Sequence, residues 1–500
     1  MTSQDASFIY GESHSGPLHI GTLDIFDGPI DYDELVEHMA NRMHLLHRYR
    51  QKLVFVPFNL AHATFEDDPD FDLRNHIKCH SLPEGTDDKA FVRAAMAVFE
   101  PMLDRRKPVW EMHLFQGLAG GRSAVMWKIH HCLVDGVSGM ELMTVSLDLR
   151  SEAQHPPPPE QPWEPPPLPS PFRRLTNAVI DLVQNRLNEA RKAAELIESP
   201  RTVADQAAML LGYAGKAAGM MSRQIVAAPW NAGLVTPSRS LAWLNVSFSD
   251  VRAIRNALGG TVNDIVLAML SEAAARYMKH HEVRTNHAPL RIGCPVNVRR
   301  GAESGALGNR VSMMFPELPS EPMEVVARVQ SVIRETERIK AGNEPHALEL
   351  MLSGSDLISP TMMGLGSLIG SRAIDLASRL GDMAPAGLTK MLTLPPPGIN
   401  FIATNVPGAQ VPLYLAGRKM TEMVGLVPLS ANLGYNVAIV SYNQMLIFGM
   451  MAEPRLMPDV DLMQAFAAEV FIELMSAAKH AAQARASGAG GSAEKASHAA

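Results

Sequence analysis

The chain has 500 residues, and 46% of them are hydrophobic, which allows large buried cores and excludes global disorder. Its 45 lysines and arginines are outnumbered by 52 aspartates and glutamates, so the chain lacks the basic footprint of a nucleic-acid-binding protein. Three scattered cysteines, Cys79, Cys132 and Cys294, have no metal-ligand spacing and give no disulfide framework, which is typical of a reducing compartment.

The first residues and the hydropathy pattern bear on location. Residues 1–16, MTSQDASFIYGESHSG, have neither the basic start nor the apolar stretch of a secretory signal. The chain also lacks a run of about 18 uninterrupted apolar residues, which a membrane-spanning helix requires. These features predict a cytoplasmic protein without a membrane span.

Residues 1–150 are predicted to form an N-terminal lobe in which a buried strand, SAVMWKIH (123–130), leads into HHCLVDGVSG. Side chains alternate between the two faces of a strand, so His130 and His131 are expected to point in opposite directions. That geometry disfavours a shared metal ion, and no HExxH motif or cysteine–histidine cluster supplies further ligands. The sequence therefore predicts no metal site.

Two interpretations of the paired histidines remain: polar residues satisfied in a core, or a general base with its support. The Asp135-Gly136 pair favours the second. Gly136 allows an unusual backbone angle as the chain turns from strand to helix. Asp135 stands near the helix start, where a carboxylate can cap amides or pair with a buried arginine such as Arg50, Arg105 or Arg299. A histidine held at such a turn is well placed to accept a proton.

Proline marks the end of this lobe, because residues 151–171 contain ten prolines and are expected to form an extended, semi-rigid spacer. A helical pattern follows over 172–198, so we predict a linker over residues 151–235. A C-terminal lobe is predicted over 236–484. The low-complexity residues 485–500 are predicted to be a disordered tail.

The C-terminal lobe mixes both kinds of element, so the fold class is α/β with mixed sheets. Alternating apolar runs flank a predicted hairpin turn at Tyr442-Asn443-Gln444. Helices are expected over 249–258, 261–281 and 323–340, and strands over 241–248 and 290–298. The Asn263-Asp264 pair opens one of these helices, where it can cap the helix or donate a hydrogen bond to a reacting group.

The motif HHCLVDG (130–136) matches the HHxxxDG signature of the coenzyme A-dependent acyltransferase superfamily. The chain from about residue 5 to 480 resembles one branch of it, the bacterial wax ester synthases/acyl-CoA:diacylglycerol acyltransferases. The similar stretches follow the family's order: DASFIYGES (5–13), PLHIGTLDIF (17–26), MLDRRKPVWE (102–111), TVNDIVLA (261–268), PVNVRR (295–300), LGNRVSMMFPELP (307–319), TNVPGAQVPLYLAG (404–417) and SYNQMLIFG (441–449). Val109 and Thr404 depart from it, since the family often has leucine and usually serine there.

The resemblance implies two chloramphenicol-acetyltransferase-like lobes with a tunnel between them. It implies transfer of a long-chain acyl group from acyl-CoA, the co-substrate, to a fatty alcohol or diacylglycerol, with no further cofactor. The second histidine of the motif is the family's base, which gives His131, and the aspartate, Asp135, is usually structural. His130, Gly136, Asn263 and Asp264 become supporting residues, and the Thr404-Asn405 region is a second source of an oxyanion donor.

The other residues of these motifs carry further expectations. Cys132 stands beside His131, but the strand alternation turns it away from the base, so direct transfer is favoured over an acyl-enzyme. The Arg105-Arg106-Lys107 run either meets coenzyme A phosphates or is an exposed charge run. Two alternatives to this activity stay open: a non-catalytic lipid-droplet or lipid-carrier protein, and a condensing enzyme that uses another acyl thioester.

Lipid substrates also imply peripheral contact with a membrane or lipid droplet. Residues 175–226 and 360–380 are the candidate surfaces, because both mix apolar residues with arginines.

Overall fold

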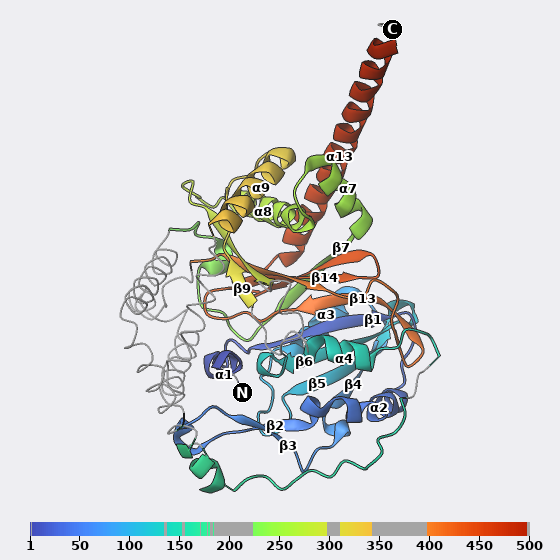
Figure 1. Cartoon of the computed structure of the whole chain (residues 1–500), viewed down its shortest axis with the longest axis vertical. Coiled ribbons are helices and arrows are strands. Elements are labelled where there is room, and N and C mark those ends of the chain that lie inside the picture. Colours follow the sequence, from blue (N-terminus) through green and yellow to red (C-terminus); the bar gives the residue numbers. More distant parts are fainter. Residues whose placement is uncertain are drawn as a thin grey trace, which may run out of the picture.

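The computed structural model describes residues 1, 3–134, 138–152, 156–170, 172–177, 179–180, 184, 224–297, 311–342 and 398–497. Two mixed sheets form the body of the protein and lie one above the other in Figure 1. This arrangement confirms the predicted α/β class. Short 3₁₀ helices occur at Met43–Leu45, His47–Arg50, Pro57–Asn59, Leu73–Asn75, Ala119–Gly121, His131–Leu133 and Pro229–Asn231.

The first sheet has six strands in the order β12-β13-β1-β6-β5-β4, and only β4 and β5 run parallel. Its strand β6 coincides with the predicted strand and is buried along its whole length. The strands are β12 (Tyr414–Leu415), β13 (Arg418–Leu426), β1 (His19–Phe26), β6 (Ser123–His130), β5 (Trp110–Leu118) and β4 (Ile77–Thr86).

The helices of this lobe are α1 (Ser3–Gly11), α2 (Tyr32–Ala40), α3 (Asp88–Phe99) and α4 (Ser138–Ser146), with a separate ribbon of β2 (Gln51–Val54) and β3 (Thr64–Asp67). Asp31 and Asp87 cap α2 and α3 by accepting hydrogen bonds from first-turn amides. Local sequence therefore sets where both helices begin.

The lobes are not continuous in sequence, which corrects the predicted division at residues 1–150 and 236–484. Strands β12 and β13 come from the C-terminal half, yet β13 pairs along β1 in the first sheet. Periodicity predicts that a segment is a strand, but it does not name the strand's partner. The C-terminal half therefore completes the sheet that carries the two histidines.

The second sheet follows the order β10-β8-β11-β14-β15-β7, with β9 beside β8. The helices of this half pack together on one face of it (Figure 1). The strands are β7 (Ser240–Ser247), β8 (Leu290–Asn297), β9 (Val311–Met314), β10 (Glu317–Leu318), β11 (Phe401–Pro407), β14 (Tyr435–Tyr442) and β15 (Met445–Ala452), and the helices are α7 (Phe248–Leu258), α8 (Val262–His280), α9 (Val325–Ala341) and α13 (Val460–Ser497).

The predicted hairpin is confirmed between β14 and β15. Its two turn residues, Asn443 and Gln444, have φ angles of 44° and 64°. Positive φ at both central positions is the geometry of the two-residue hairpin turn whose twist matches the flanking strands.

The two sheets approach each other at backbone distance where β13 crosses β14 and β15. A Cβ atom on Gly449 would lie 2.2 Å from the carbonyl oxygen of Gly425, and one on Gly425 would lie 2.6 Å from the Cβ of Ala438. Glycine is required here because any side chain would push the sheets apart.

The proline-rich segment lies against the first lobe and runs along its lower edge in Figure 1. Trp163 anchors it: the indole Nε1 donates to Asp67 Oδ2 at 3.3 Å, and the guanidinium of Arg50 lies 4.5 Å from the Trp163 ring centroid. The predicted spacer is thus bound to the lobe as well as extended.

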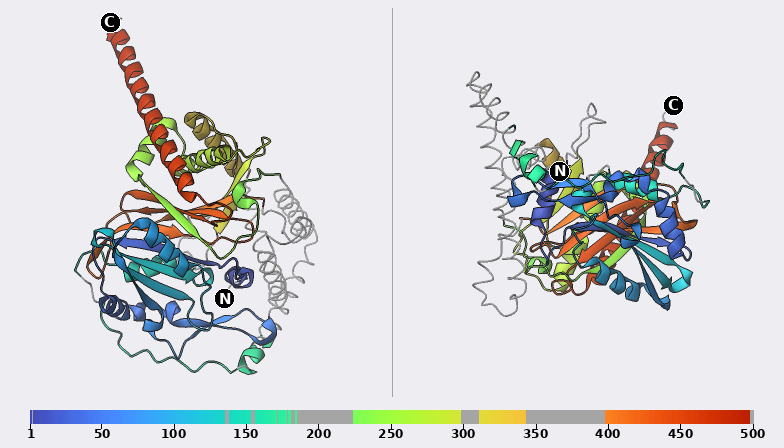
Figure 2. Two further views of the ribbon diagram at one scale, coloured as in Figure 1. Left: turned by 180° about the vertical axis from the view of Figure 1, so that it is seen from behind. Right: turned by 90° about the horizontal axis from the view of Figure 1, so that it is seen from below.

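Helix α13 continues to Ser497 and projects away from the body in both Figure 1 and Figure 2, whereas a disordered tail was predicted from residue 485. Its first half packs on α7 and α8, and Val470 and Leu474 are buried there. Adding a residue to a formed helix requires no new nucleation, which favours continuation past the packed part.

Asp24 is a buried carboxyl in the middle of β1, between core residues Leu23 and Ile25. Its side-chain Oδ1 has no hydrogen-bond partner among the described residues. Burial raises the pKa of Asp24 to about 7, against a smaller lowering by Thr22. The neutral acid is therefore the form that this fold accommodates.

Asp24→Asn is expected to become more stabilising, relative to wild type, as pH rises. The carboxyl ionises near pH 3.8 in the unfolded chain and near pH 7 in the folded chain. The protonated Asp24 therefore contributes its full stability to the wild type below pH 3.8, and this contribution is lost as the pH rises to 7. The difference in unfolding free energy between the two proteins should grow by about 1.4 kcal/mol per pH unit in this window and then level off. Urea denaturation across the pH series measures it, and a pH-independent difference would contradict the shift.

Candidate active site

The two histidines belong to different local structures. Strand β6 ends at His130, and His131 begins the 3₁₀ helix His131–Leu133. The amide of His130 donates to Val109 O at 2.9 Å, and the amide of His131 donates to Leu18 O at 3.0 Å. The turn therefore sets the direction of His131, and strand alternation stops at His130.

His130 is fully buried and engaged in structure. Its Nδ1 accepts the backbone amide of Cys132 at 3.2 Å, so a neutral ring carries its proton on Nε2. That Nε2 lies 3.4 Å from Glu12 Oε2, which is an ion-pair distance without the geometry of a good hydrogen bond. One ring nitrogen thus faces the Cys132 amide and the other faces Glu12, which leaves His130 unsuited to act on a substrate.

Glu12 is the carboxylate beside this turn, and its side chain is completely buried. Arg105 donates to Glu12 Oε2 from Nη2 at 2.6 Å and from Nε at 3.2 Å, and the Leu18 amide donates to Oε1 at 2.9 Å. Burial alone would raise the pKa of Glu12, but His130, Arg105 and the Leu18 amide outweigh it and lower the pKa to about 2. Glu12 is therefore an anion in the folded protein.

His131 is partly buried under an aromatic side chain. The ring of Phe8 on α1 stacks on its imidazole with centroids 3.8 Å apart and planes 11° from parallel. Its Nδ1 is enclosed and has no hydrogen-bond partner among the described residues, and the residue as a whole is only partly buried. Burial lowers the pKa of His131, against a smaller opposite effect of its own backbone carbonyl. The imidazole is thus neutral at pH 7 and able to accept a proton.

Cys132 is buried beside His131 and does not have the character of a nucleophile. Burial raises the pKa of its thiol far above the ordinary value, so the thiolate is disfavoured. A thiol acts as a nucleophile through its thiolate, so this environment favours direct transfer.

The structure does not test the remaining residues of the motif. Asp135 and Gly136 lie outside the described residues, as does Arg299. Arg105 is bound to Glu12, and Arg50 stacks on Trp163. The partner of Asp135 stays undetermined.

Asn263 and Asp264 lie in the first turn of α8, in which Thr261 is the cap. Asp264 Oδ2 accepts from the amide and hydroxyl of Thr261 at 2.7 and 2.8 Å, which forms a capping box, and Oδ1 accepts from Thr336 of α9 at 2.8 Å. Within the described part of the chain, no hydrogen bond joins Asn263 or Asp264 to the histidine turn. The N-cap is thus Thr261 and not the Asn263-Asp264 pair, although Asp264 completes the capping box, and the oxyanion role of Asn263 stays a prediction.

The Thr404-Asn405 pair lies on β11, where it is paired with β14. Thr404 is half-buried and Asn405 is exposed. Their part in the chemistry also stays a prediction.

Sequence reasoning missed Phe8 and Glu12 and misread Arg105. Both missed residues belong to the stretch DASFIYGES, which drew attention only as part of the resemblance. Arg105 was considered with Arg106 and Lys107 as a phosphate site or an exposed run, but Arg105 is partly buried against Glu12. Arg106 and Lys107 are exposed, and Arg106 pairs with Asp104 at 2.9 Å. A glutamate in a polar segment carries no sequence signal of burial, so the ion pair of Glu12 with Arg105 could not be predicted.

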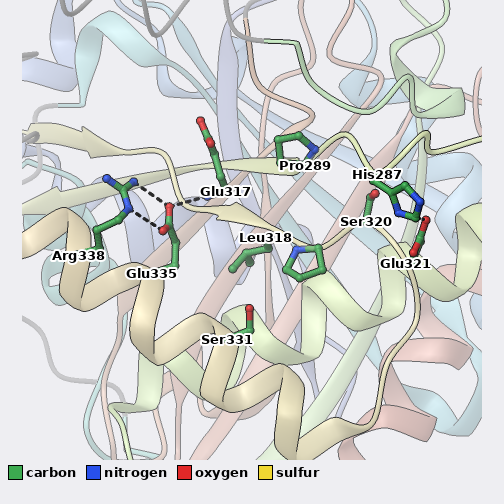
Figure 3. A pocket seen from close by; sticks show the side chains of 10 residues that line it. His287, Pro289, Glu317, Leu318, Ser320, Glu321, Ser331, Glu335 and Arg338 are labelled. Carbon is green, nitrogen blue, oxygen red and sulfur yellow. Dashed lines mark hydrogen bonds and ion pairs between the residues drawn. The ribbon is translucent and has the colours of Figure 1, made fainter.

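Two pockets lie away from the histidine turn. One of about 500 Å³ is formed by β10, α9 and the loop before β8, and its charged groups already pair, as Arg338 does with Glu335 and His287 with Glu321 (Figure 3). Another of about 510 Å³ lies under the proline-rich segment beside Trp163. Neither is lined by the histidine turn, and the tunnel between the lobes stays a prediction.

The described residues also bear on a metal site and on a membrane span. They contain no group of three or more histidine, cysteine or acidic side chains arranged to hold a metal ion. None of their helices has the length and apolarity needed to cross a bilayer. The candidate lipid-contacting segments, 175–226 and 360–380, fall almost wholly outside them.

Comparison with protein families gives matches over most of the chain. The wax ester synthase/diacylglycerol acyltransferase catalytic domain matches residues 1–266, and the C-terminal domain of the same family matches residues 307–475. The catalytic-domain match includes the whole histidine turn with Phe8, Glu12 and Arg105.

Individual proteins agree with this match. Two Mycobacterium tuberculosis proteins, each named as a probable diacylglycerol O-acyltransferase, are 26% identical to this chain. One aligns over 91% of this chain and 90% of its own length, and the other over 93% and 96%.

Solved structures share the fold. A wax ester synthase/diacylglycerol acyltransferase from Marinobacter aquaeolei VT8 has a TM-score of 0.61 at 22% identity, over 96% of this chain and 99% of that one. A starter condensation domain of rhizomide synthetase has a TM-score of 0.52 at 15% identity, over 95% and 92%.

Proposed function

The chain belongs to the wax ester synthase/diacylglycerol acyltransferase family of acyl-CoA-dependent O-acyltransferases, and we propose that His131 is its general base in transferring a long-chain acyl group to an alcohol. The acceptor in this proposal is the free hydroxyl of a diacylglycerol or of a fatty alcohol, so the product is triacylglycerol or a wax ester. The relatives' names favour diacylglycerol.

The observation that carries the proposal is the contrast between the two histidines. Both nitrogens of His130 are directed at Cys132 and Glu12 and the residue is fully buried, whereas His131 is only partly buried and its ring is neutral. A general base must be unprotonated and must be able to reach the proton that it takes. His130 is enclosed by its partners, so we assign the role to His131, which meets the first condition and is exposed in part.

The reaction follows from these properties. As the alcohol oxygen attacks the thioester carbonyl, Nε2 of His131 takes the hydroxyl proton and becomes imidazolium. The tetrahedral intermediate then collapses, the carbon–sulfur bond breaks, and the imidazolium returns its proton to the coenzyme A thiolate. The products are an ester and free coenzyme A, and His131 is again neutral.

The proposal is tested by incubating the purified protein with labelled palmitoyl-CoA, with and without dipalmitoylglycerol or hexadecanol. Ester and free thiol should form in equal amounts only when an alcohol is present. Without alcohol the protein should stay unlabelled, because the Cys132 thiol is not activated. A stable protein-bound label that is lost in Cys132→Ser would contradict direct transfer. The two acceptors in competition identify the preferred substrate.

We also propose that the reaction takes place at a lipid surface, since both the acceptor and the product are insoluble. Flotation of the protein with neutral-lipid emulsions at low and high salt tests this, and a protein that stays wholly in the aqueous fraction in both would contradict it.

A further inference from the structure

We propose that Glu12 is a positioning residue for His131, which it holds in place through Leu18 and His130. The inference rests on the proposed function, because it assumes that the position of His131 limits the rate. Glu12 does not contact His131 in the described structure. Its buried carboxylate instead contacts two residues that hold the His131 turn: Leu18, just before β1, and His130, at the end of β6.

The first connection passes through the start of β1. Glu12 Oε1 accepts the amide of Leu18 at 2.9 Å, and the carbonyl of Leu18 accepts the amide of His131 at 3.0 Å. Two hydrogen bonds in series thus join the carboxylate to the backbone of His131. A shift of Glu12 would move Leu18 and with it the first residue of the turn.

The second connection passes through His130. Glu12 Oε2 lies 3.4 Å from His130 Nε2, and the other ring nitrogen accepts the amide of Cys132 at 3.2 Å. An anion next to Nε2 favours the proton there, which leaves Nδ1 free to accept from Cys132. Since Cys132 follows His131, the turn is held on both sides of the base.

Arg105 fixes Glu12 itself. It donates twice to Oε2, and its Nη2 also donates to the carbonyl of Ile9 at 3.0 Å. Ile9 is on α1 beside Phe8, whose ring covers the imidazole of His131. The same ion pair therefore fixes the carboxylate and the helix that packs on the base.

The substitution Glu12→Gln separates charge from shape. A glutamine fills the same volume, and its carbonyl can still accept from Leu18. Its amide group would then lie where Oε2 was, so that NH₂ faces the donors of Arg105 and the proton on His130 Nε2. Buried donors that face one another leave hydrogen bonds unmade, and the turn must move to relieve them.

The experiment compares Glu12→Gln and Glu12→Asp with wild type in the ester assay, with Glu37→Gln as the control. Glu37 is an exposed glutamate on α2 of the same lobe. We expect kcat to fall about 10- to 100-fold in Glu12→Gln, because a misplacement of about 1 Å costs on the order of 10²-fold. The KM for palmitoyl-CoA should stay within about twofold of wild type, since no substrate contact is lost. Glu12→Asp keeps the charge but is one methylene shorter, so it should give an intermediate kcat. Glu37→Gln should match wild type.

The pH profile separates positioning from other roles. If Glu12 only positions the base, the acid limb of kcat/KM keeps its wild-type pKa in both variants while kcat falls. All rates are taken well below each variant's melting temperature, so that loss of fold is excluded. A folded Glu12→Gln or Glu12→Asp protein with wild-type kcat overturns the inference. So does a shifted acid limb, since it would make Glu12 part of the titrating chemistry.

His131→Ala is assayed in parallel to separate the two proposals. A normal rate in His131→Ala overturns the proposed function. A normal rate in Glu12→Gln beside an inactive His131→Ala overturns only the positioning role.

Discussion

Replacing His131 by alanine is expected to lower the turnover number by about 10² to 10⁴ while the melting temperature stays near that of wild type. The factor is the usual contribution of a positioned general base. Stability should be kept because His131 is only partly buried and its Nδ1 has no partner among the described residues. The hydrogen bond from its amide to the Leu18 carbonyl belongs to the backbone, so alanine keeps it. Initial rates of coenzyme A release and of ester formation measure the effect.

His130→Ala is the control for this prediction. It removes a fully buried ring that accepts the Cys132 amide and faces Glu12, so it should lower the melting temperature clearly. The adjacent substitutions should thus differ in kind: one loses activity with its fold intact, and the other loses stability first. Near-normal ester formation by His131→Ala would refute its assignment as the base.

Arg328→Met is expected to lower the free energy of unfolding by about 3–5 kcal/mol, the usual cost of removing one member of a buried ion pair. Arg328 and Glu272 join α9 to α8, and their side chains are 1% and 0% exposed. Arg328 Nε donates to Glu272 Oε2 at 2.9 Å, and its other nitrogens donate to the carbonyls of Pro319 and Glu321 at 2.6 Å each. Methionine fills part of the volume but makes none of these bonds.

The matched control is Arg334→Met, an exposed arginine on the same helix, which should change stability by less than about 0.5 kcal/mol. Urea denaturation of both variants beside wild type measures the difference. Because the hydrogen bonds of Arg328 go to Glu272, Pro319 and Glu321, and none of them to the histidine turn, ester formation at low temperature should survive in Arg328→Met. Equal stability of the two variants would show that the α8–α9 contact does not depend on the pair.

Local patterns in the sequence predicted the elements that carry the site. The strand ending at His130 and the hairpin at Asn443-Gln444 depend on neighbouring residues, so alternation and turn composition were sufficient. The capping box at Thr261 and Asp264 also follows a local pattern, serine or threonine followed three residues later by an acid. The N-cap had instead been considered for the Asn263-Asp264 pair, which begins two residues after Thr261.

What the sequence did not predict depends on contacts between distant segments. The stacking of Phe8 on His131, the ion pair of Glu12 with Arg105, and the pairing of β13 with β1 each join parts of the chain whose spacing carries no signal. The direction of His131 is a second case, since alternation along a strand ceases to hold at the residue where the strand ends. The choice of His131 over His130 followed from the resemblance, and the proposal draws its physical support from the fold.

The central claim, that a neutral His131 takes the hydroxyl proton, is tested most directly by the pH dependence of kcat/KM for ester formation in wild type and in His131→Ala. A protonated imidazole cannot accept a proton, so the wild-type rate should fall on the acid side. Because burial lowers the pKa of His131, the inflection should lie below about 6.5, the ordinary value for histidine. The residual activity of His131→Ala should lack this limb. An inflection above 6.5, or the same acid limb in the residual activity of His131→Ala, would contradict the account.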